Sequence, residues 1–184
     1  LRNNRLIPNA MEPRAAVAEY DAIADSYVLH STTQNPHLLR LVICAFVLNI
    51  PESKMQIVAP DVGGGFGSKI YLYAEVACCT WASKKLRRPI KWTADRTQAF
   101  LSDAHGRDHI NKVQMALDEN NKIIGLRVDT LANLGSYLSA FAVVTPTYLH
   151  GTLLSGCYAI PAIYTNVKGM ATTTAPVDAY RGAG

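Results

Sequence analysis

The stretch Gly63-Gly64-Gly65-Phe66-Gly67-Ser68-Lys69 constrains the fold more than any other part of the sequence. Its four glycines permit backbone angles and close approaches that other residues rarely adopt. The apolar run at 55–60 predicts a strand before it, and a helical pattern predicts a helix from about Ile70. Free N–H groups and the positive end of a helix dipole would then converge there. The stretch is therefore predicted to bind an anionic cofactor, and a ligand-free turn is the alternative.

The spacing of this stretch excludes two common glycine motifs. A dinucleotide fingerprint requires G-x-G-x-x-G, but Ser68 occupies the third glycine position counted from Gly63. A Walker loop requires Gly, Lys and then Ser or Thr in succession, whereas Ser68 separates Gly67 from Lys69 and Ile70 follows. Neither a Rossmann nucleotide site nor a P-loop is indicated.

The length and charge of the chain indicate a globular protein without a nucleic-acid surface. Its 184 residues suffice for one domain with a core, or for two small domains. The net charge is only +4, and the basic cluster at 84–88 has no interleaved aromatic residues. That cluster is therefore interpreted as a solvated helix end, and no nucleic-acid partner is expected.

The four cysteines, Cys44, Cys78, Cys79 and Cys157, form no C-x-x-C pair. No zinc ribbon or iron–sulfur site is therefore indicated within this chain. Three of the four lie in apolar sequence, which suggests buried free thiols in a reducing, cytoplasmic compartment. No apolar run reaches the roughly 18 residues that span a bilayer.

Apolar periodicity predicts an α+β fold with a mixed sheet and helices. A helix should begin at Asn35-Pro36, with Leu38, Leu39, Val42, Ile43, Phe46 and Val47 on its core face. The second helix should place Ile70, Tyr73, Ala74, Ala77, Cys78 and Trp81 on one face. Further helices are predicted at 95–101 and 143–154, and strands at 15–20, 27–33, 90–93 and 163–173, with a hairpin joining 108–117 to 122–132.

Several polar residues outside the glycine stretch are candidate site residues with open alternatives. Gln34 could donate to a ligand oxygen or cap local backbone, and local sequence favours capping. Arg181 stands beside glycine and suits an anion or an oxo ligand, or is an exposed loop arginine. His105 and His109 are four apart, but Gly106 replaces the glutamate of a zinc protease, so structural roles are favoured.

Seven stretches, in their order along the chain, resemble the large molybdenum-binding subunit of the xanthine dehydrogenase/aldehyde oxidase/aerobic carbon-monoxide dehydrogenase family. They are Asn9-Ala10-Met11-Glu12-Pro13-Arg14, Thr33-Gln34-Asn35-Pro36-His37, Gly63 to Lys69, Arg87-Arg88-Pro89-Ile90-Lys91-Trp92, Asp95-Arg96-Thr97, His105-Gly106-Arg107-Asp108 and Ala179-Tyr180-Arg181-Gly182. The resemblance covers nearly the whole chain, and the ordered set is far more specific than any single motif.

The resemblance implies a molybdopterin cofactor, commonly its cytosine dinucleotide in bacteria. It places Gln34 beside a molybdenum oxo ligand, Gly64, Gly65, Phe66 and Gly67 against the metal centre and pterin, and Arg181 at the border of the metal centre. Gln34, Phe66 and Arg181 would thus lie nearest the metal. Backbone donors, an amide and a guanidinium around an anionic metal–oxo group agree with the chemistry inferred from the residues.

Three substrate-pocket positions depart from well-known family members. Purine-oxidising members carry a glutamate where Ile70 stands and an arginine that aligns by count with Leu149, so xanthine is disfavoured. Members with a copper–molybdenum centre carry Cys-Ser-Phe after the loop arginine, whereas Gly182-Ala183-Gly184 follows here without a thiolate. The ending resembles form II carbon-monoxide-dehydrogenase-like proteins, and small aldehydes or N-heterocycles remain open as substrates.

The chain is expected to be an internal piece, 1–184, of a longer molybdopterin-binding region. The glutamate that serves as catalytic base in the family would lie beyond Gly184, so the piece alone should be inactive. The resemblance implies an iron–sulfur small subunit carrying [2Fe–2S] clusters and a flavin-binding medium subunit carrying FAD, assembled as a dimer of heterotrimers. A phosphate-ligand binding module and a non-catalytic scaffold are the competing hypotheses.

Overall fold

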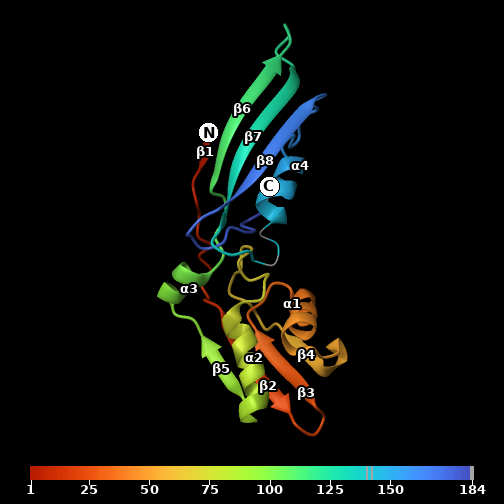
Figure 1. The fold of residues 1–184 in the computed structure, drawn as a ribbon, viewed down its shortest axis with the longest axis vertical. Coiled ribbons are helices and arrows are strands. Elements are labelled where there is room, and N and C mark those ends of the chain that lie inside the picture. The colour runs from red at the N-terminus through yellow and green to blue at the C-terminus, as the bar shows by residue number, and fades with distance from the viewer. Residues whose placement is uncertain (140, 142, 183–184) are drawn as a thin grey trace. The chain divides into compact units, whose positions relative to one another are not determined.

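The computed structural model describes residues 1–139, 141 and 143–182, and it divides the chain into two compact units (Figure 1). Residues 9–103 form the first, here called the loop unit because it contains the glycine stretch. Residues 1–8 and 104–184 form the second, here called the hairpin unit. Each unit combines helices with its own four-stranded sheet, which confirms the α+β prediction.

The loop unit surrounds a mixed sheet with strand order β4-β3-β2-β5. β2 pairs antiparallel with both β3 and β5, and β3 pairs parallel with β4. Its elements are β2 (Ala15–Asp21), β3 (Ser26–Ser31), α1 (Pro36–Val42), the π-helical turn η1 (Ile43–Leu48), the 3₁₀ turn η2 (Glu52–Lys54), β4 (Met55–Val58), α2 (Ala74–Leu86), β5 (Ile90–Thr93) and α3 (Arg96–Ser102). The predicted strands and the predicted helices at 36 and 95–101 are confirmed.

Helix α2 covers one face of this sheet, as Figure 1 shows, and its buried face differs from the predicted one. Val76, Cys79, Thr80 and Ser83 are buried, whereas Trp81 is 53% exposed. The hydroxyl of Thr80 donates to the Val76 carbonyl at 2.8 Å, and that of Ser83 donates to the Thr80 carbonyl at 2.7 Å. Because these hydroxyls are satisfied inside the helix, small polar residues can face the sheet while the large indole stays outside.

Helix α1 begins as predicted, with the Asn35 side chain accepting from the Leu38 N–H at 3.1 Å. Its predicted core face is only partly correct, because the chain widens into the π-turn η1 at Ile43. That change of helical period leaves Leu39 and Ile43 buried but turns Phe46 outward, where it is 81% exposed. A left-handed residue, Asn49, then ends the turn.

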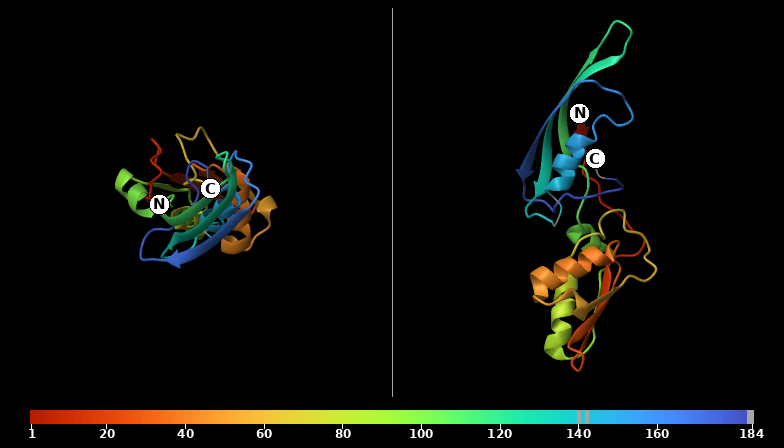
Figure 2. Two further views of the ribbon diagram at one scale, coloured as in Figure 1. Left: turned by 90° about the horizontal axis from the view of Figure 1, so that it is seen from above. Right: turned by 90° about the vertical axis from the view of Figure 1, so that its right-hand side faces the viewer.

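The hairpin unit surrounds a second sheet with strand order β1-β6-β7-β8. Its elements are β1 (Arg2–Asn3), β6 (His109–Leu117), β7 (Ile123–Gly135), the π-turn η3 (Val144–Leu149), the short helix α4 (His150–Thr152) and β8 (Ile163–Ala171). β6 and β7 form the predicted antiparallel hairpin, and β8 pairs parallel with β7 (Figure 2). The helix predicted at 143–154 is confirmed at 144–152, where it consists of the π-helical segment η3 followed by the single α-helical turn α4. Among the described residues, no helix is long and apolar enough to cross a bilayer.

Candidate cofactor-binding site

The glycine stretch, which follows β4, is fastened to the end of β3 by Gln34. The N–H groups of Gly67 and Lys69 donate to Oε1 of Gln34 at 2.9 Å and 3.2 Å. In return, the Gln34 N–H donates to the Lys69 carbonyl at 2.8 Å, and the Thr33 hydroxyl donates to the same carbonyl at 3.2 Å. The role favoured for Gln34 from local sequence was wrong: Asn35 caps α1, and Gln34 binds a backbone segment more than 30 residues away.

This attachment explains why the stretch needs glycine. A Cβ on Gly65 would lie 2.3 Å from Oε1 of Gln34, too close for any side chain. Gly64 and Gly67 have φ angles of +96° and +102°, and Phe66 between them has φ of +53°. Such angles favour glycine, and a phenylalanine held there indicates a backbone shape imposed by its surroundings.

The opposite side of the stretch is fastened by Glu12. Oε2 of Glu12 accepts from the Gly63 N–H at 2.9 Å and from Nζ of Lys69 at 2.9 Å. Lys69 is buried, with its side chain 1% exposed, so this ion pair holds its charge inside the unit. Burial opposes ionisation of Glu12, but the bonds from Lys69 and Gly63 outweigh it and lower the pKa of the Glu12 carboxyl below its ordinary value.

These contacts correct the expected array of unoccupied backbone donors. The amides of Gly63, Gly64, Gly67, Ser68 and Lys69 all donate to acceptors within the chain. By contrast, the Gly65 amide has no acceptor within the part of the chain that the structure describes, although Gly65 is buried. The backbone of the stretch thus offers far fewer donors to a ligand than the sequence suggested.

The expected helix start beside the stretch is also wrong, because α2 begins at Ala74 rather than near Ile70. A helix begun at Ile70 would need the Lys69 carbonyl for its first turn, and Thr33 and Gln34 already occupy that carbonyl. The first turn of α2 instead carries Glu75, which pairs with Arg14. A carboxylate of α2 itself therefore occupies the positive end of the helix dipole, and the glycine stretch does not lead directly into this helix.

The orientation of the Gln34 side-chain amide determines whether its oxygen or its nitrogen is available to a ligand. Two backbone N–H groups bind its oxygen, so the oxygen must point at the stretch and the nitrogen must point away. Nε2 forms no hydrogen bond with any other residue among those described, and Gln34 is exposed. The two N–H donors of Nε2 and the Gly65 amide therefore remain without an acceptor among the described residues, and oxygen atoms of an anionic group would match such donors.

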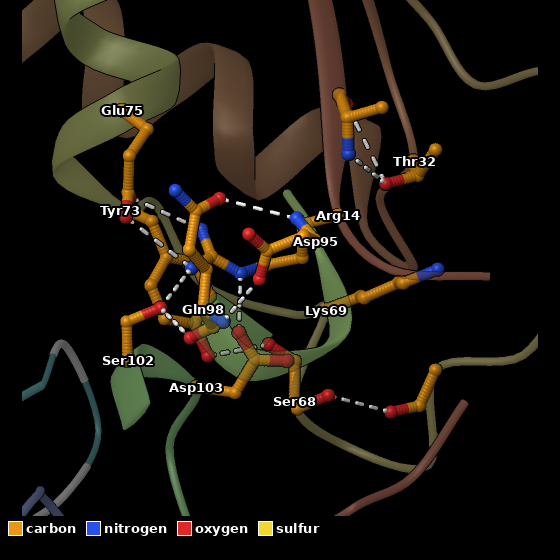
Figure 3. A network of polar contacts seen from close by, with 12 residues as sticks. Arg14, Thr32, Ser68, Lys69, Tyr73, Glu75, Asp95, Gln98, Ser102 and Asp103 are labelled. Carbon is orange, nitrogen blue, oxygen red and sulfur yellow. Dashed lines mark hydrogen bonds and ion pairs between the residues drawn. The ribbon is translucent and has the colours of Figure 1, made fainter. Parts of the chain in front are cut away.

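An arginine cluster that the sequence analysis did not single out lies behind the stretch (Figure 3). Arg14 is 3% exposed and pairs with Asp103 at 2.6 Å and with Glu75 at 3.2 Å. Its guanidinium carbon lies 3.6 Å from the centre of the Tyr73 ring, and the Tyr73 hydroxyl donates to the Ser68 carbonyl at 2.7 Å. Burial lowers the pKa of Arg14, but its bonds to Glu75 and Asp103 outweigh this effect and raise the pKa overall. The cluster thus supports the stretch through Tyr73.

Arg181 lies in the hairpin unit, so its predicted proximity to Gln34 stays a prediction. It has a left-handed φ of +43°, and its guanidinium carbon lies 5.8 Å from the centre of the Tyr180 ring. Of the predicted pocket residues, Ile70 is half-buried in the loop unit and Leu149 is half-buried at the end of η3. Ala183 lies outside the described residues.

The histidines and cysteines occupy structural environments. Nδ1 of His105 lies 3.0 Å from a guanidinium nitrogen of Arg5, and the rings of His109 and His150 are 4.5 Å apart between centres. The described residues contain no cluster of three or more His, Cys, Asp or Glu side chains able to hold a metal ion. Cys44 and Cys79 are buried but Cys78 and Cys157 are exposed, one buried thiol fewer than expected.

Comparisons with known proteins identify the family of this chain. The family model for the molybdopterin cofactor-binding domain matches residues 1–184. The carbon monoxide dehydrogenase large chain of Hydrogenophaga pseudoflava is 38% identical over 94% of this chain and 21% of that protein. The nicotine 6-hydroxylase large subunit of Paenarthrobacter nicotinovorans is 33% identical over 98% of this chain and 22% of that protein.

A solved structure extends the similarity to the fold. The crystal structure of quinoline 2-oxidoreductase from Pseudomonas putida 86 superposes with a TM-score of 0.92 and 30% identity, covering 100% of this chain and 24% of that one. The chain spans about a fifth of the length of the curated relatives it matches. The chain belongs to the molybdopterin cofactor-binding domain family found in the large subunits of molybdenum hydroxylases.

Proposed function

We propose that residues 1–184 are part of the molybdopterin-binding region of a molybdenum hydroxylase large subunit, carbon-monoxide-dehydrogenase-like in sequence. When bound, the molybdenum group would supply oxidation of a small substrate with oxygen derived from water. The chain's own residues would hold that group: Gln34 through Nε2, Gly65 through its amide, and Arg181 through its guanidinium. Gly64, Phe66 and Gly67 would shape the backbone around it.

The single observation that carries this proposal is the fixed orientation of Gln34. Its oxygen is occupied by the amides of Gly67 and Lys69, at 2.9 Å and 3.2 Å, so only its nitrogen can meet a ligand. A hydrogen-bond donor held by two backbone contacts is preorganised and needs no rearrangement when an oxo group arrives. The residues present therefore fit an anionic oxo ligand, and they would not fit a cation.

The substrate class follows from the neutral pocket positions. Ile70 and Leu149 carry no charge and cannot anchor a polar heterocycle such as xanthine. The sequence offers no cysteine directly after Arg181, so a copper–thiolate site is disfavoured there. We propose a small neutral substrate, either an aldehyde or an N-heterocycle, and carbon monoxide is the less favoured candidate.

The remaining parts of the proposal concern the assembled enzyme. The cofactor would be the molybdopterin cytosine dinucleotide, and electrons would leave through [2Fe–2S] clusters and FAD on partner subunits. This chain has no C-x-x-C pair that could hold such clusters. A dimer of heterotrimers in the cytoplasm completes the proposed arrangement.

The decisive experiment uses the full-length protein with its partners and compares two substitutions of Gln34. Gln34→Glu keeps acceptor oxygens for the Gly67 and Lys69 amides but removes the outward N–H donors. It should retain thermal stability, while turnover of aldehyde and N-heterocycle substrates falls roughly 100-fold, as for loss of one preorganised donor. Arg40→Ala, at an exposed ion pair with Glu52, is the control and should leave both unchanged.

Two results would contradict the proposal. Purified full-length protein containing phosphate but no molybdenum would favour a binding module instead of an enzyme. Unchanged turnover in both Gln34→Glu and Arg181→Ala would show that these two residues do not belong to the cofactor site. Arg181→Ala should lower the rate far more than it lowers stability.

A further inference from the structure

The segment that carries Arg181 is fastened to a distant bend, residues 105–108, inside the hairpin unit. The His105 N–H donates to the Pro176 carbonyl at 2.9 Å, and the Asp178 N–H donates to the His105 carbonyl at 2.7 Å. His105 and Val177 thus form a parallel β-bridge. The two segments run side by side up to the residues just before Arg181.

Gly106 brings the bend into direct contact with Tyr180. A Cβ on Gly106 would lie 2.2 Å from the Tyr180 Cβ and 2.9 Å from its Cγ. Only glycine permits this approach, because both neighbouring atoms belong to the rigid base of the tyrosine side chain. The bend therefore fixes the position of the residue that precedes Arg181.

Arg107 fastens the residue that follows Arg181. Its guanidinium donates to the Gly182 carbonyl at 3.1 Å, and its carbon lies 5.4 Å from the centre of the Tyr180 ring. Arg107 contacts both neighbours of Arg181 in this way. The turn itself adopts an uncommon shape, since Arg181 and Gly182 have φ angles of +43° and +86°. A chain turn of this kind needs outside contacts to remain in one conformation.

The bend is itself held rigid. Arg107 and Asp108 are consecutive left-handed residues, with φ of +65° and +68°, a conformation that costs energy for residues other than glycine. Arg5 holds it in place: Nε donates to Asp108 at 3.0 Å, and a terminal nitrogen donates to the Ala175 carbonyl at 2.8 Å. One side chain thus binds the bend and the Arg181 segment together. Strained backbone with this much support is typical of functional regions.

We propose that Arg107 is a positioning residue that holds Arg181 in its working conformation by fastening Tyr180 and Gly182. This inference rests on the proposed function, because the turn at 180–182 matters only if Arg181 binds the anionic group. Arg107 touches neither cofactor nor substrate in this role. It limits the directions that the Arg181 guanidinium can take, so the anionic group meets a donor that is already oriented.

The first test measures the turn directly, in the full-length protein, by hydrogen exchange of peptides that cover residues 176–182. Arg107→Gln removes the guanidinium without changing the backbone preference, since both residues carry an unbranched side chain. Exchange should quicken roughly five- to tenfold, as expected for the loss of one hydrogen bond and a ring contact. Unchanged exchange would overturn the proposal.

Arg127→Gln is the matched control. Arg127 also combines one hydrogen bond, to Asp129 at 3.2 Å, with a tyrosine contact, to Tyr164 at 5.0 Å. It lies on β7 and contacts no residue of the turn among those described. Arg127→Gln should leave exchange at 176–182 and turnover unchanged, and an equal effect from both variants would contradict a specific role for Arg107.

The second test separates positioning from the proposed enzyme activity. Arg107→Gln should keep molybdenum content and KM close to normal while kcat falls roughly tenfold, and Arg107→Lys should restore part of the loss by donating to the Gly182 carbonyl. Faster exchange with unchanged kcat would show that Arg107 holds the turn at 180–182 but that this does not affect catalysis. If the full-length protein holds no molybdenum, the proposed function itself fails, and the exchange result still decides whether Arg107 fastens the turn.

Discussion

The Gly65 backbone lies so close to the Gln34 side chain that a single added methyl group would stand 2.3 Å from the Gln34 oxygen. Each residue therefore restricts what the other can be. The contact holds the glycine stretch against the end of β3 and fixes which end of the Gln34 amide faces outward. It also yields a prediction that is independent of any cofactor.

Gly65→Ala should destabilise the loop unit strongly, but much less when Gln34 is already alanine. All three atoms nearest the new Cβ belong to the part of Gln34 that truncation removes. A double-mutant cycle by urea denaturation should give a coupling energy of about 0.5–3 kcal/mol, as for residues in direct contact. Gly125→Ala is the control, since its nearest neighbour would be at an ordinary 3.7 Å. Additive effects of the two substitutions would refute the contact.

Arg14→Ala should cost about 3–5 kcal/mol of unfolding free energy, because it leaves buried carboxylate charge without its partner. Arg14 and Asp103 are 3% and 7% exposed at the side chain, and Glu75 shares the same guanidinium. Arg40→Ala breaks an exposed pair with Glu52 and should change stability by less than about 1 kcal/mol. Similar losses from both substitutions, measured by denaturant titration, would contradict the special role of the cluster.

Acidification should loosen the glycine stretch through Glu12. Hydrogen bonds from Lys69 and Gly63, which outweigh burial, lower the pKa of Glu12 below 4.5 in the folded protein. A lowered carboxyl pKa means that its contribution is complete above the ordinary pKa and is lost as pH falls through the folded value. The protection of the amides at 63–69, taken relative to their intrinsic exchange rate at each pH, should therefore fall below about pH 4.5. Glu12→Gln should show low protection at every pH, and a pH profile of protection identical to that of the natural protein would disprove this role.

His109 should make the stability of the hairpin unit depend on pH in a higher range than Glu12 does, between its ordinary pKa of 6.5 and its lowered pKa of about 4. Burial, with the nearby His150 and Arg107, lowers its pKa from 6.5 to about 4. The unfolded chain therefore binds more protons between those values, and stability falls as pH falls. His109 should therefore cost the protein roughly 2 kcal/mol of unfolding free energy between pH 7 and pH 5. His109→Gln should weaken this dependence in thermal unfolding and leave the part that comes from His150, whose pKa is also lowered by burial. His37→Gln, at an exposed position, should leave the dependence unchanged.

Local patterns in the sequence were sufficient for most strands and for the family. The hairpin of β6 and β7 follows from alternation around a polar turn at 118–121, and α1 follows from Asn35 and Pro36. These features depend on residues close together in the chain. The ordered set of short motifs likewise needed no tertiary contact to suggest a molybdenum hydroxylase, and the family match agrees with it.

The errors arise where distant residues compete for the same backbone groups. Nothing near Lys69 indicates that its carbonyl is taken by Thr33 and Gln34, so the start of α2 was placed too early. The donors of the glycine stretch were overcounted for the same reason. In the Arg14 cluster, Arg14 contacts Glu75 and Asp103, which follow it in the sequence by 61 and 89 positions. Periodicity carries no signal at such separations.

The parallel pairing of β4 with β3 has a consequence for the order in which the loop unit folds. β2 and β3 are adjacent in sequence and can pair early, whereas pairing of β4 with β3 closes the longer segment that contains α1 and η1 and is expected later. The glycine stretch leaves from β4, so it would be among the last segments of the unit to acquire its shape. The contact between Gly65 and Gln34 would therefore form only after β4 has joined the sheet.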